Sequence, residues 1–536
     1  MTGKGCIAAG HPETVRAAAI ILEEGGNAFD AVLAATYAAC VVEPVLSSLG
    51  GGGFLMASPG DGAPDSGEAP RAPVLYDFFT QTPKRRPGDL GEGQGLDFHP
   101  ITADFGAVTQ DFHIGMAAIA TPGVLKGLFQ VHRDLCTMPM TRIVEPAMEL
   151  ASKGFTVNRL QAYLFQVVGP IYMHSEDSRA IFASGDSPAE LMGEGETMTN
   201  RDFADTLEAL AREGEDLFYR GEIAAAVSAD CRSGGGLLDR DDFEFYRAEK
   251  RQPFVTEYRG ARLYTNPPPS TGGILIAFAL ELLKDMDVGA LGTGSADHLG
   301  TLVKVMGLTN RARVESGLRE SVSEDVIETL LNPDFLAAYK AKVLNRPKAE
   351  RGTTHISIID ADRNAASLTM SNGEGVGYIA PGTGIMLNNM LGEEDINPMG
   401  FHQWPVDTRL SSMMAPSLVF EPGGNLTALG SGGSNRIRTA ILQVLVNLLD
   451  FSMSAEAAVE APRLHYEGES LNLESGFTES AIEQLFRDYP ENKLWDDRNL
   501  FFGGVHAVRF DSPRGRFAGV FSGGGDPRRG GAVLTV

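Results

Sequence analysis

Two threonines and a histidine, Thr353-Thr354-His355, stand directly after the polar segment 345–352 (Asn-Arg-Pro-Lys-Ala-Glu-Arg-Gly). That segment is typical of an exposed linker, and the residues after it predict a strand. A threonine hydroxyl is a weak nucleophile unless a base lies beside it. One such base is the residue's own α-amine, which is released only when the preceding peptide bond is cut. Its pKa of roughly 7.7–8.0 suits a general base. The pattern therefore predicts a cleavage site between Gly352 and Thr353 that creates the catalyst, although ordinary strand threonines fit the same local pattern.

A second strand-like run ends at Met370, and a turn centred on Asp362-Arg363 would fold it back on the first run. In that hairpin, residue 353 pairs near residue 372 and residue 354 pairs near residue 371. Ser371 and Asn372 are therefore expected beside Thr353, where either side chain could hydrogen-bond its hydroxyl or its amine.

A glycine-rich turn, Gly430-Ser431-Gly432-Gly433-Ser434, precedes a predicted helix at 436–450. Backbone N–H groups at the start of a helix suit a developing oxyanion. The rival interpretation makes Ser431 the nucleophile of an α/β-hydrolase, but that motif requires Gly at position 429, which is Leu. The four glycines at 50–53 lack the Gly-Lys-Ser/Thr that a phosphate-binding loop needs.

Several longer motifs in the same order resemble those of the γ-glutamyltranspeptidase family, from about residue 5 to the C-terminus. They are Gly25-Gly26-Asn27-Ala28-Phe29-Asp30-Ala31, Val42-Glu43-Pro44, the glycines at 50–53, Thr121-Pro122-Gly123, Pro267-Pro268-Pro269-Ser270-Thr271-Gly272-Gly273, Thr353-Thr354-His355-Ile356-Ser357, Gly382-Thr383-Gly384-Ile385-Met386-Leu387-Asn388-Asn389, Leu410-Ser411-Ser412-Met413 and Asp526-Pro527-Arg528.

The resemblance implies an N-terminal-nucleophile hydrolase that is made as one chain and cuts itself. The expected products are a large subunit, 1–352, and a small subunit, 353–536, which remain associated in one interleaved domain. The implied fold is a layered α/β (α+β) structure, a four-layer αββα sandwich. In it Thr353 is both the processing residue and the nucleophile. Ser371 stands where the family usually has a Thr that contacts the nucleophile. The N–H groups of Gly433 and Ser434 form the oxyanion hole, whose second position is commonly Gly.

One departure from the family concerns the donor side of the site. The glutamyl enzymes carry an Arg soon after an Asp-Phe pair, where it grips the donor's α-carboxylate, but here Phe79 fills that place. A hydrogen bond to a charged group is worth about 1.5–3 kcal/mol. We therefore expect free γ-glutamyl donors to bind weakly unless Arg85, Arg86 or Arg409 substitutes.

The amine side of the resemblance is mixed. Glu393 lies near the family's amine-binding Asp, whereas Met390 replaces a polar neighbour of that group. Ser411 and Ser412 are retained, and their hydroxyls are expected to contact a substrate carboxylate. The stretch from Glu393 to Ser411 is shorter than in lidded relatives, which indicates an open mouth that admits bulkier acyl groups.

The leading functional hypothesis is therefore an autoprocessing amidohydrolase or acyltransferase acting through a threonine acyl-enzyme. It places γ-glutamyl amides slightly ahead of other small-molecule amides, such as oxamate-like acids or cephalosporin side chains, with water or an amine or peptide as acceptor. The competing hypothesis is an unprocessed, non-catalytic relative that binds metabolites or partners.

The composition of the chain mainly argues against certain partners and ligands. With 45 basic and 70 acidic residues among 536, the formal charge is −25, which disfavours nucleic acid and anionic membranes as partners. The start of the sequence has no signal-peptide pattern, so a cytoplasmic location is expected, or a periplasmic or secreted one if a leader has been removed. No His or carboxylate cluster has metal-ligand spacing, so neither a metal nor a cofactor is expected. His355 is expected to be structural, on the strand face opposite the nucleophile.

The elements that must position these residues are visible in the sequence. Residues 12–42 predict two helices, of which the second is apolar nearly all round and hence buried. Residues 54–57 and 74–78 predict a hairpin-like pair of strands. Residues 122–345 are mostly helical in pattern, with a break at 264–273.

Overall fold

The computed structural model describes residues 3–60, 72–91, 93–104, 109–318, 324–332, 335–336, 339, 353–397, 399–512 and 519–536. The predicted linker 345–352, including Gly352 of the proposed cleavage site, lies outside the described residues.

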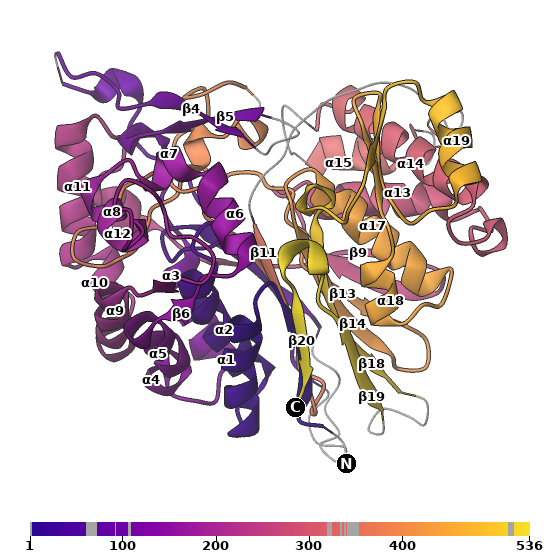
Figure 1. The fold of residues 1–536 in the computed structure, drawn as a ribbon, viewed down its shortest axis with the longest axis horizontal. Coiled ribbons are helices and arrows are strands. Elements are labelled where there is room, and N and C mark those ends of the chain that lie inside the picture. Colours follow the sequence, from indigo (N-terminus) through magenta and orange to yellow (C-terminus); the bar gives the residue numbers. More distant parts are fainter. Residues whose placement is uncertain are drawn as a thin grey trace.

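Two antiparallel sheets form the middle of the molecule (Figure 1). The first has seven strands in the order β20, β1, β11, β12, β2, β3 and β8. In that order they span Ala532–Thr535, Gly5–Ala9, Thr354–Asp360, Ala365–Ser371, Gly52–Ser58, Val74–Phe78 and Glu249–Arg251. The second has six strands, in the order β19, β18, β14, β13, β10 and β9. They span Val520–Gly524, Gly504–Asp511, Leu426–Gly432, Ser417–Phe420, Ala261–Thr265 and Phe254–Tyr258.

Helices cover the outer face of each sheet, so the predicted four-layer αββα sandwich is confirmed (Figure 1). On the side of the first sheet lie α1 Pro12–Glu23, α2 Ala28–Val42, α3 Val124–Leu135, α4 Met140–Ile143, α5 Glu145–Lys153, α6 Arg159–Val167, α7 Gly169–Tyr172, α8 Glu176–Phe182, α9 Arg201–Glu213, α10 Asp216–Tyr219, α11 Glu222–Gly234 and α12 Arg240–Phe245. On the side of the second lie α13 Gly272–Leu283, α14 Ala296–Glu315, α15 Glu324–Leu331, α17 Arg436–Leu449, α18 Ala455–Glu460 and α19 Glu479–Asp488.

Smaller elements complete the chain. The two-stranded sheets are β4 His99–Asp104 with β5 Thr109–Ile114, and β6 Phe155–Thr156 with β7 Thr197–Met198. A three-stranded sheet contains β15 Leu464–Glu467, β16 Ser470–Glu474 and β17 Asn492–Trp495. The 3-10 turns are η1 Pro87–Asp89, η2 Met116–Ala118, η3 Gly289–Leu291, η4 Met390–Gly392, η5 Glu394–Ile396, η6 Leu500–Phe502 and η7 Pro527–Arg529.

Segments on either side of residue 353 share both sheets. β11 and β12 lie between β1 and β2 in the first sheet, and β13 pairs with β10 in the second. Neither segment could therefore complete a sheet without the other.

Most of the predicted elements are present. The two helices within residues 12–42 are α1 and α2, the predicted strand pair is β2 with β3, and the helix at 436–450 is α17. Every residue of α2 is buried, as its all-round apolar pattern predicts. The mostly helical interpretation of 122–345 was wrong for β8, β9 and β10. β8 is an edge strand of three charged residues, so it carries no apolar signal, whereas the alternation in β9 and β10 was available in the sequence.

The central strand β11 is buried on both faces, which explains its incomplete alternation of residue types. Ile356 and Ile358 pack in the core that contains α1 and α2, while Ile359 packs in the core between the sheets and beneath α17. His355 also faces the second sheet, because its ring stacks on that of His506 in β18. Residues two apart on a strand share a face. The expectation that His355 points away from Thr353 was therefore wrong.

His355 nevertheless has the predicted structural environment. It is fully buried, with Nδ1 2.8 Å from Thr369 Oγ1 and Nε2 2.9 Å from Ser357 Oγ. A Cβ on Gly430 would lie 2.3 Å from His355 Cε1, so the glycine permits the close approach of the two sheets. Burial holds the pKa of His355 well below its usual value, and the ring is neutral.

Asp360 ties the end of β11 to the start of α2 and gives a testable pH dependence. Its Oδ2 accepts from the backbone N–H of Ala28 at 2.8 Å, and its Oδ1 accepts from that of Asn364 at 2.9 Å. Burial raises the pKa of Asp360 to about 6. Because the folded pKa exceeds the unfolded value, folding favours the protonated form. The free energy of unfolding should therefore fall as pH rises from about 4 to about 6, by up to roughly 3 kcal/mol.

Asp360→Asn mimics the protonated carboxyl at every pH, so this contribution should disappear from its urea-unfolding profile. Asp362→Asn removes the same charge from an exposed position in the same turn and is the matched control. Identical slopes for wild type and Asp360→Asn between pH 4 and pH 6 would show that the assignment is wrong.

Candidate active site

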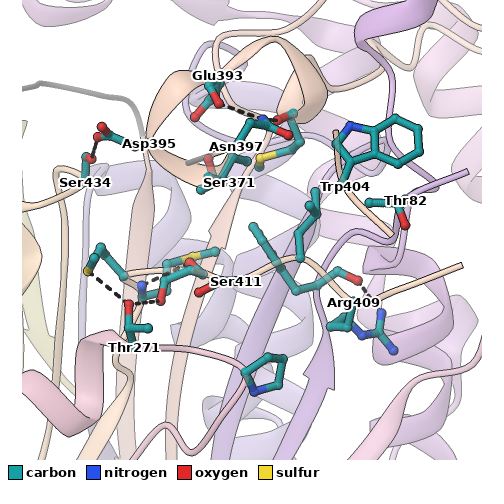
Figure 2. A pocket seen from close by; sticks show the side chains of 18 of the residues that line it. Thr82, Thr271, Ser371, Glu393, Asp395, Asn397, Trp404, Arg409, Ser411 and Ser434 are labelled. Atoms are coloured by element: carbon teal, nitrogen blue, oxygen red, sulfur yellow. Dashed lines mark hydrogen bonds between the residues drawn. The ribbon is translucent and has the colours of Figure 1, made fainter. Parts of the chain in front are cut away.

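A cavity of about 330 Å³ lies at the end of the sheet interface (Figure 2). Seven of the predicted catalytic and substrate-binding residues line it, and they come from segments distant in the chain. They are Phe79, Thr353, Ser371, Glu393, Ser411, Ser412 and Ser434. The fold therefore brings the predicted nucleophile, its hydroxyl neighbour and the proposed substrate contacts to one cavity.

Thr353 immediately precedes β11 and is only 4% exposed. Its carbonyl oxygen accepts a hydrogen bond from Arg529 Nη1 at 3.2 Å. A Cβ on residue 432 would lie 2.1 Å from that oxygen, so only Gly allows β14 to approach so closely. The backbone of Thr353 is thus held between an arginine and the start of the glycine-rich turn.

The hairpin register places Ser371 beside Thr353. Thr354 pairs with Met370, so the next position along the ladder sets Thr353 opposite Ser371. The predicted register was therefore one residue off. Successive strand residues point to opposite faces, and Thr354 accordingly turns away from the cavity. Its hydroxyl donates to the buried Glu43 at 2.7 Å, and burial raises the pKa of that carboxyl.

The same alternation corrects the prediction for Asn372. Its side chain is fully buried, and it does not line the cavity, because Ser371 occupies the cavity face at that end of β12. Neither Oδ1 nor Nδ2 of Asn372 has a hydrogen-bond partner among the described residues. Asn372 therefore lies outside the cavity lining, directly after Ser371.

The turn from β14 to α17 presents backbone groups beside Thr353. Gly433 has a φ of 120° and Ser434 a φ of 49°, both in the region that favours glycine. The carbonyl groups of these residues accept from the N–H groups of Arg436 and Ile437, each at 3.0 Å, which fixes the turn on α17. Ser434 lines the cavity, and Gly433 directly precedes it.

Ser431 does not have the environment of a nucleophile. It is fully buried, its hydroxyl donates to Gly432 O at 2.8 Å, and it accepts from the N–H of Gly504 at 3.1 Å. The hydroxyl is therefore used to join β14 to β18.

The comparisons with known proteins match this arrangement. The family model for γ-glutamyltranspeptidase matches residues 14–79 and 96–536. The chain belongs to the γ-glutamyltranspeptidase family. It is 31% identical to a glutathione hydrolase proenzyme of Escherichia coli K12 (87% of this chain, 82% of that protein) and 30% identical to an acylase ACY 1 proenzyme of Pseudomonas sp. V22 (96% and 91%). A cephalosporin acylase from Bacillus halodurans has the same fold, with a TM-score of 0.80 at 23% identity over 99% of this chain and 96% of that one.

Membership of the γ-glutamyltranspeptidase family makes the protein an N-terminal-nucleophile hydrolase. Its sequence is almost equally identical to a glutathione hydrolase and to an acylase of that family. The choice between the donors of these two kinds of enzyme therefore depends on the residues that line the cavity.

Phe79 makes the donor side of the cavity apolar. It is 1% exposed, and its ring stacks on that of Phe54 with centroids 5.3 Å apart. Arg409 lines the cavity but is held by the protein itself. Its guanidinium donates to Phe79 O, to the Tyr246 hydroxyl and to Arg247 O, and its Nε lies 3.4 Å from Asp77 Oδ1. Arg85 and Arg86 do not line the cavity. None of these three arginines is therefore placed to bind the donor's α-carboxylate in place of the family's arginine.

A second wall of the cavity is formed by the segment after β12 and by residues before β13. Glu393 is 4% exposed, and its carbonyl accepts from Asn397 Nδ2 at 2.6 Å. Ser412 Oγ accepts from the N–H of Met414 at 3.1 Å, whereas Ser411 is half-buried. Met390 and Trp404 add apolar surface to this wall.

Sequence reasoning missed several polar residues of the site, among them Arg529, Asp395 and Arg313. Arg529 is 176 residues from Thr353, and only the Asp-Pro-Arg motif before it was noted. Burial lowers the pKa of Arg529 to about 10, yet that value keeps it charged at neutral pH. Asp395 accepts a hydrogen bond from Ser434 Oγ at 2.9 Å. No spacing in the sequence links 395 to 434.

Across the described ranges, no three His, Cys, Asp or Glu side chains converge as metal ligands. In the same part of the chain, no helix has the length and apolar character needed to cross a bilayer.

Proposed function

We propose that the protein is a self-processing amidohydrolase whose nucleophile is Thr353. Cleavage of the Gly352–Thr353 bond frees the α-amine of Thr353, which then takes the proton of the Thr353 hydroxyl as Oγ attacks an amide carbonyl. The N–H groups of Gly433 and Ser434 stabilise the oxyanion. The amine of the substrate leaves with the proton, and the acyl-enzyme passes its acyl group to water or to an amine. Ser371, opposite Thr353 in the ladder, orients the nucleophile.

The position of Thr353 supports processing at this bond. It is the first residue that the structure describes after Tyr339, and β11 follows at once in the middle of a sheet. Residues 1–352 and 353–536 share both sheets, so the two products would remain associated after cleavage. Both curated relatives described above are named proenzymes.

We further propose that the preferred donors are amides whose acyl group is largely apolar. The observation that carries this proposal is Phe79, since it stands in the donor wall while Arg409 is engaged with Asp77 and with backbone carbonyls. Phe79 offers no charge to a free α-carboxylate, and burying that carboxylate unpaired is costly. Leu410, Met390 and Trp404 add further apolar side chains to the cavity lining.

γ-Glutamyl amides remain the second candidate because Glu393, Ser411 and Ser412 all line the cavity. These groups could hold the amine and carboxylate of an amino-acid moiety. Glu393 lies between η4 and η5, whereas Ser411 and Ser412 follow Leu410, whose N–H donates to the carbonyl of Thr80, next to Phe79, at 3.1 Å.

A substrate panel on the processed protein tests the proposal. We expect kcat/KM for phenylacetyl-p-nitroanilide to exceed that for γ-glutamyl-p-nitroanilide by about 10- to 150-fold, the value of one missing bond to a charged group. Glutaryl-p-nitroanilide, which has the carboxylate but no α-amine, should resemble the γ-glutamyl compound. Efficient hydrolysis of γ-glutamyl-p-nitroanilide with weak phenylacetyl hydrolysis would instead establish the second candidate.

A further inference from the structure

A buried arginine, Arg529 of the turn η7, contacts the backbone of the predicted nucleophile. Its Nη1 donates to the carbonyl oxygen of Thr353 at 3.2 Å. A Cβ on Gly504 would lie 2.3 Å from Arg529 Cδ, so only glycine leaves room for the side chain there. Arg529 Nη2 lies beside Gly433, 3.4 Å from where a Cβ of that residue would stand. The guanidinium is therefore held between the carbonyl of Thr353 and the proposed oxyanion turn.

A buried carboxylate, Glu43 at the end of α2, holds the next residue of the chain. Its Oε2 accepts from Thr354 Oγ1 at 2.7 Å, and its Oε1 accepts from Thr14 Oγ1 at 2.9 Å. Glu43 and Arg529 both line a second, smaller cavity of about 20 Å³. Thr353 and Thr354 are therefore each bonded to one member of a buried pair of opposite charges.

The guanidinium of Arg529 keeps its charge although it is buried. Burial lowers its pKa to about 10, and Arg436 adds to the fall, whereas Asp526, Glu374 and Glu43 oppose it. Burial also raises the pKa of Glu43, and Arg529 opposes that rise. Each charge thus reduces the cost of burying the other, and removing one partner of such a pair is costly.

Other ionisable groups surround this pair and the nucleophile. Those that face Arg529 or line the smaller cavity with it are His11, Glu374, Arg436, His506 and Asp526. Those that line the larger cavity with Thr353 are Arg313, Glu393, Asp395 and Arg409. Burial lowers the pKa of His11 and of His506 to about 4, so both rings are neutral near pH 7.

The position of Arg529 matters because the α-amine of Thr353 is the proposed base. From the backbone bond lengths, the α-nitrogen and the carbonyl oxygen of one residue lie within roughly 4 Å of each other. A cation bonded to that oxygen therefore stands close to the amine and disfavours its protonated form. A free α-amine has a pKa of roughly 7.7–8.0, and only its neutral form can take the Oγ proton.

We propose that Arg529 is a positioning residue that fixes the Thr353 carbonyl and keeps the adjacent α-amine neutral near pH 7. Glu43 has the opposite and weaker effect, because it reaches only Thr354. The inference rests on the proposed function, since the amine exists only after cleavage before Thr353. Arg529 makes and breaks no covalent bond. The proton still moves from Thr353 Oγ to the α-nitrogen and then to the leaving amine.

Five variants separate this role from a general structural one. Arg529→Met removes the charge, whereas Arg529→Lys keeps the charge without the planar guanidinium. Glu43→Gln removes the opposite charge. Thr14→Val removes one hydrogen bond to Glu43 and no charge, so it is the matched control. The double variant Glu43→Gln/Arg529→Met leaves neither charge uncompensated, and it supplies folded protein if Arg529→Met alone is unstable.

The first measurement is the pKa of the Thr353 α-amine in the processed protein. It is obtained from the pH dependence of acetylation by acetic anhydride, followed by mass spectrometry on the peptide that begins at Thr353. The pKa should rise by about one pH unit in Arg529→Met, fall by less in Glu43→Gln, and stay near wild type in Arg529→Lys and Thr14→Val. The double variant should lie between the two single ones. No rise in Arg529→Met, or shifts of the same sign in Arg529→Met and Glu43→Gln, would overturn the inference.

The second measurement is the pH profile of kcat/KM for phenylacetyl-p-nitroanilide, whose acidic limb reports the base of the free enzyme. In Arg529→Met the limb should move upward by about one pH unit, so that kcat/KM falls about tenfold at pH 6 and less at pH 9. An equal fall at every pH would assign Arg529 to the oxyanion turn and overturn the inference. An uncut wild-type chain would contradict the proposed function and the inference with it, whereas a cut, active enzyme with an unmoved limb would overturn the inference alone.

Discussion

Thr353→Ala should leave the 57.2 kDa chain uncut and reduce amide hydrolysis by roughly 10⁴-fold or more. The wild-type protein should instead give two associated fragments, residues 1–352 and 353–536. The reason is that one residue supplies both the hydroxyl that attacks and, after cleavage, the amine that accepts its proton. Intact-mass analysis follows the processing, and p-nitroaniline release follows the hydrolysis. The large effect arises because no described group on the cavity face of the strand duplicates both functions.

Two further substitutions, one at Thr353 and one at the next residue, show whether the loss of processing is specific to the Thr353 hydroxyl. Thr353→Ser keeps the hydroxyl and should still be processed, more slowly, with partial activity. Thr354→Val removes the hydroxyl of the adjacent residue, which faces Glu43 and not the cavity, so processing should continue. An intact wild-type chain that cannot be acylated at Thr353 would instead support the non-catalytic alternative.

The parts of the site that the sequence could predict are those set by local geometry. Thr353 and Ser371 are close because a short turn joins their strands, and an error of one residue in the turn moved the prediction only to Asn372. That small error still changed the role of Asn372, because alternate residues of a strand face opposite sides of the sheet. The glycine-rich turn 430–434 could be recognised because it precedes a helix of clear periodicity, whereas the choice of Gly433 and Ser434 within it came from the family resemblance.

The contacts that the sequence could not predict join distant elements. Arg529 reaches Thr353 O from the turn before β20, and Asp395 reaches Ser434 from η5. Both contacts depend on the packing of one sheet against the other, and no periodic pattern in the sequence indicates them. Arg409 shows the converse case. From the sequence it was a candidate carboxylate clamp, and only its contacts with Asp77 and Phe79 O show that it is already engaged.

The fold could be predicted where apolar residues recur over a long stretch, as in α2, which is apolar on all sides and lies beneath β11. It could not be predicted at β8, since Glu249, Lys250 and Arg251 form a strand by pairing with β3 at the sheet edge. Backbone pairing there needs no apolar side chain, so an edge strand can be entirely charged.

Phe79→Arg should shift substrate preference toward γ-glutamyl amides by about 10- to 150-fold, measured as the ratio of kcat/KM for γ-glutamyl-p-nitroanilide to that for phenylacetyl-p-nitroanilide. The new guanidinium would stand in the donor wall and pair with the α-carboxylate, while the apolar wall would lose its aromatic ring. The ratio is the proper measure because both absolute rates should fall. The substitution breaks the stack with Phe54 and places a second guanidinium near Arg409, which destabilises the fold.

Phe79→Met is the matched control, because methionine preserves an apolar side chain of similar length without a charge. Its substrate ratio should stay within about threefold of wild type, since it adds no carboxylate partner and forfeits little of the apolar contact. Thermal melts of both variants would establish that folded protein is compared. If Phe79→Arg is folded and its ratio equals that of Phe79→Met, residue 79 does not govern the choice of donor. The apolar preference would then have to come from the Met390, Trp404 and Leu410 wall, whose side chains a charge at position 79 leaves in place.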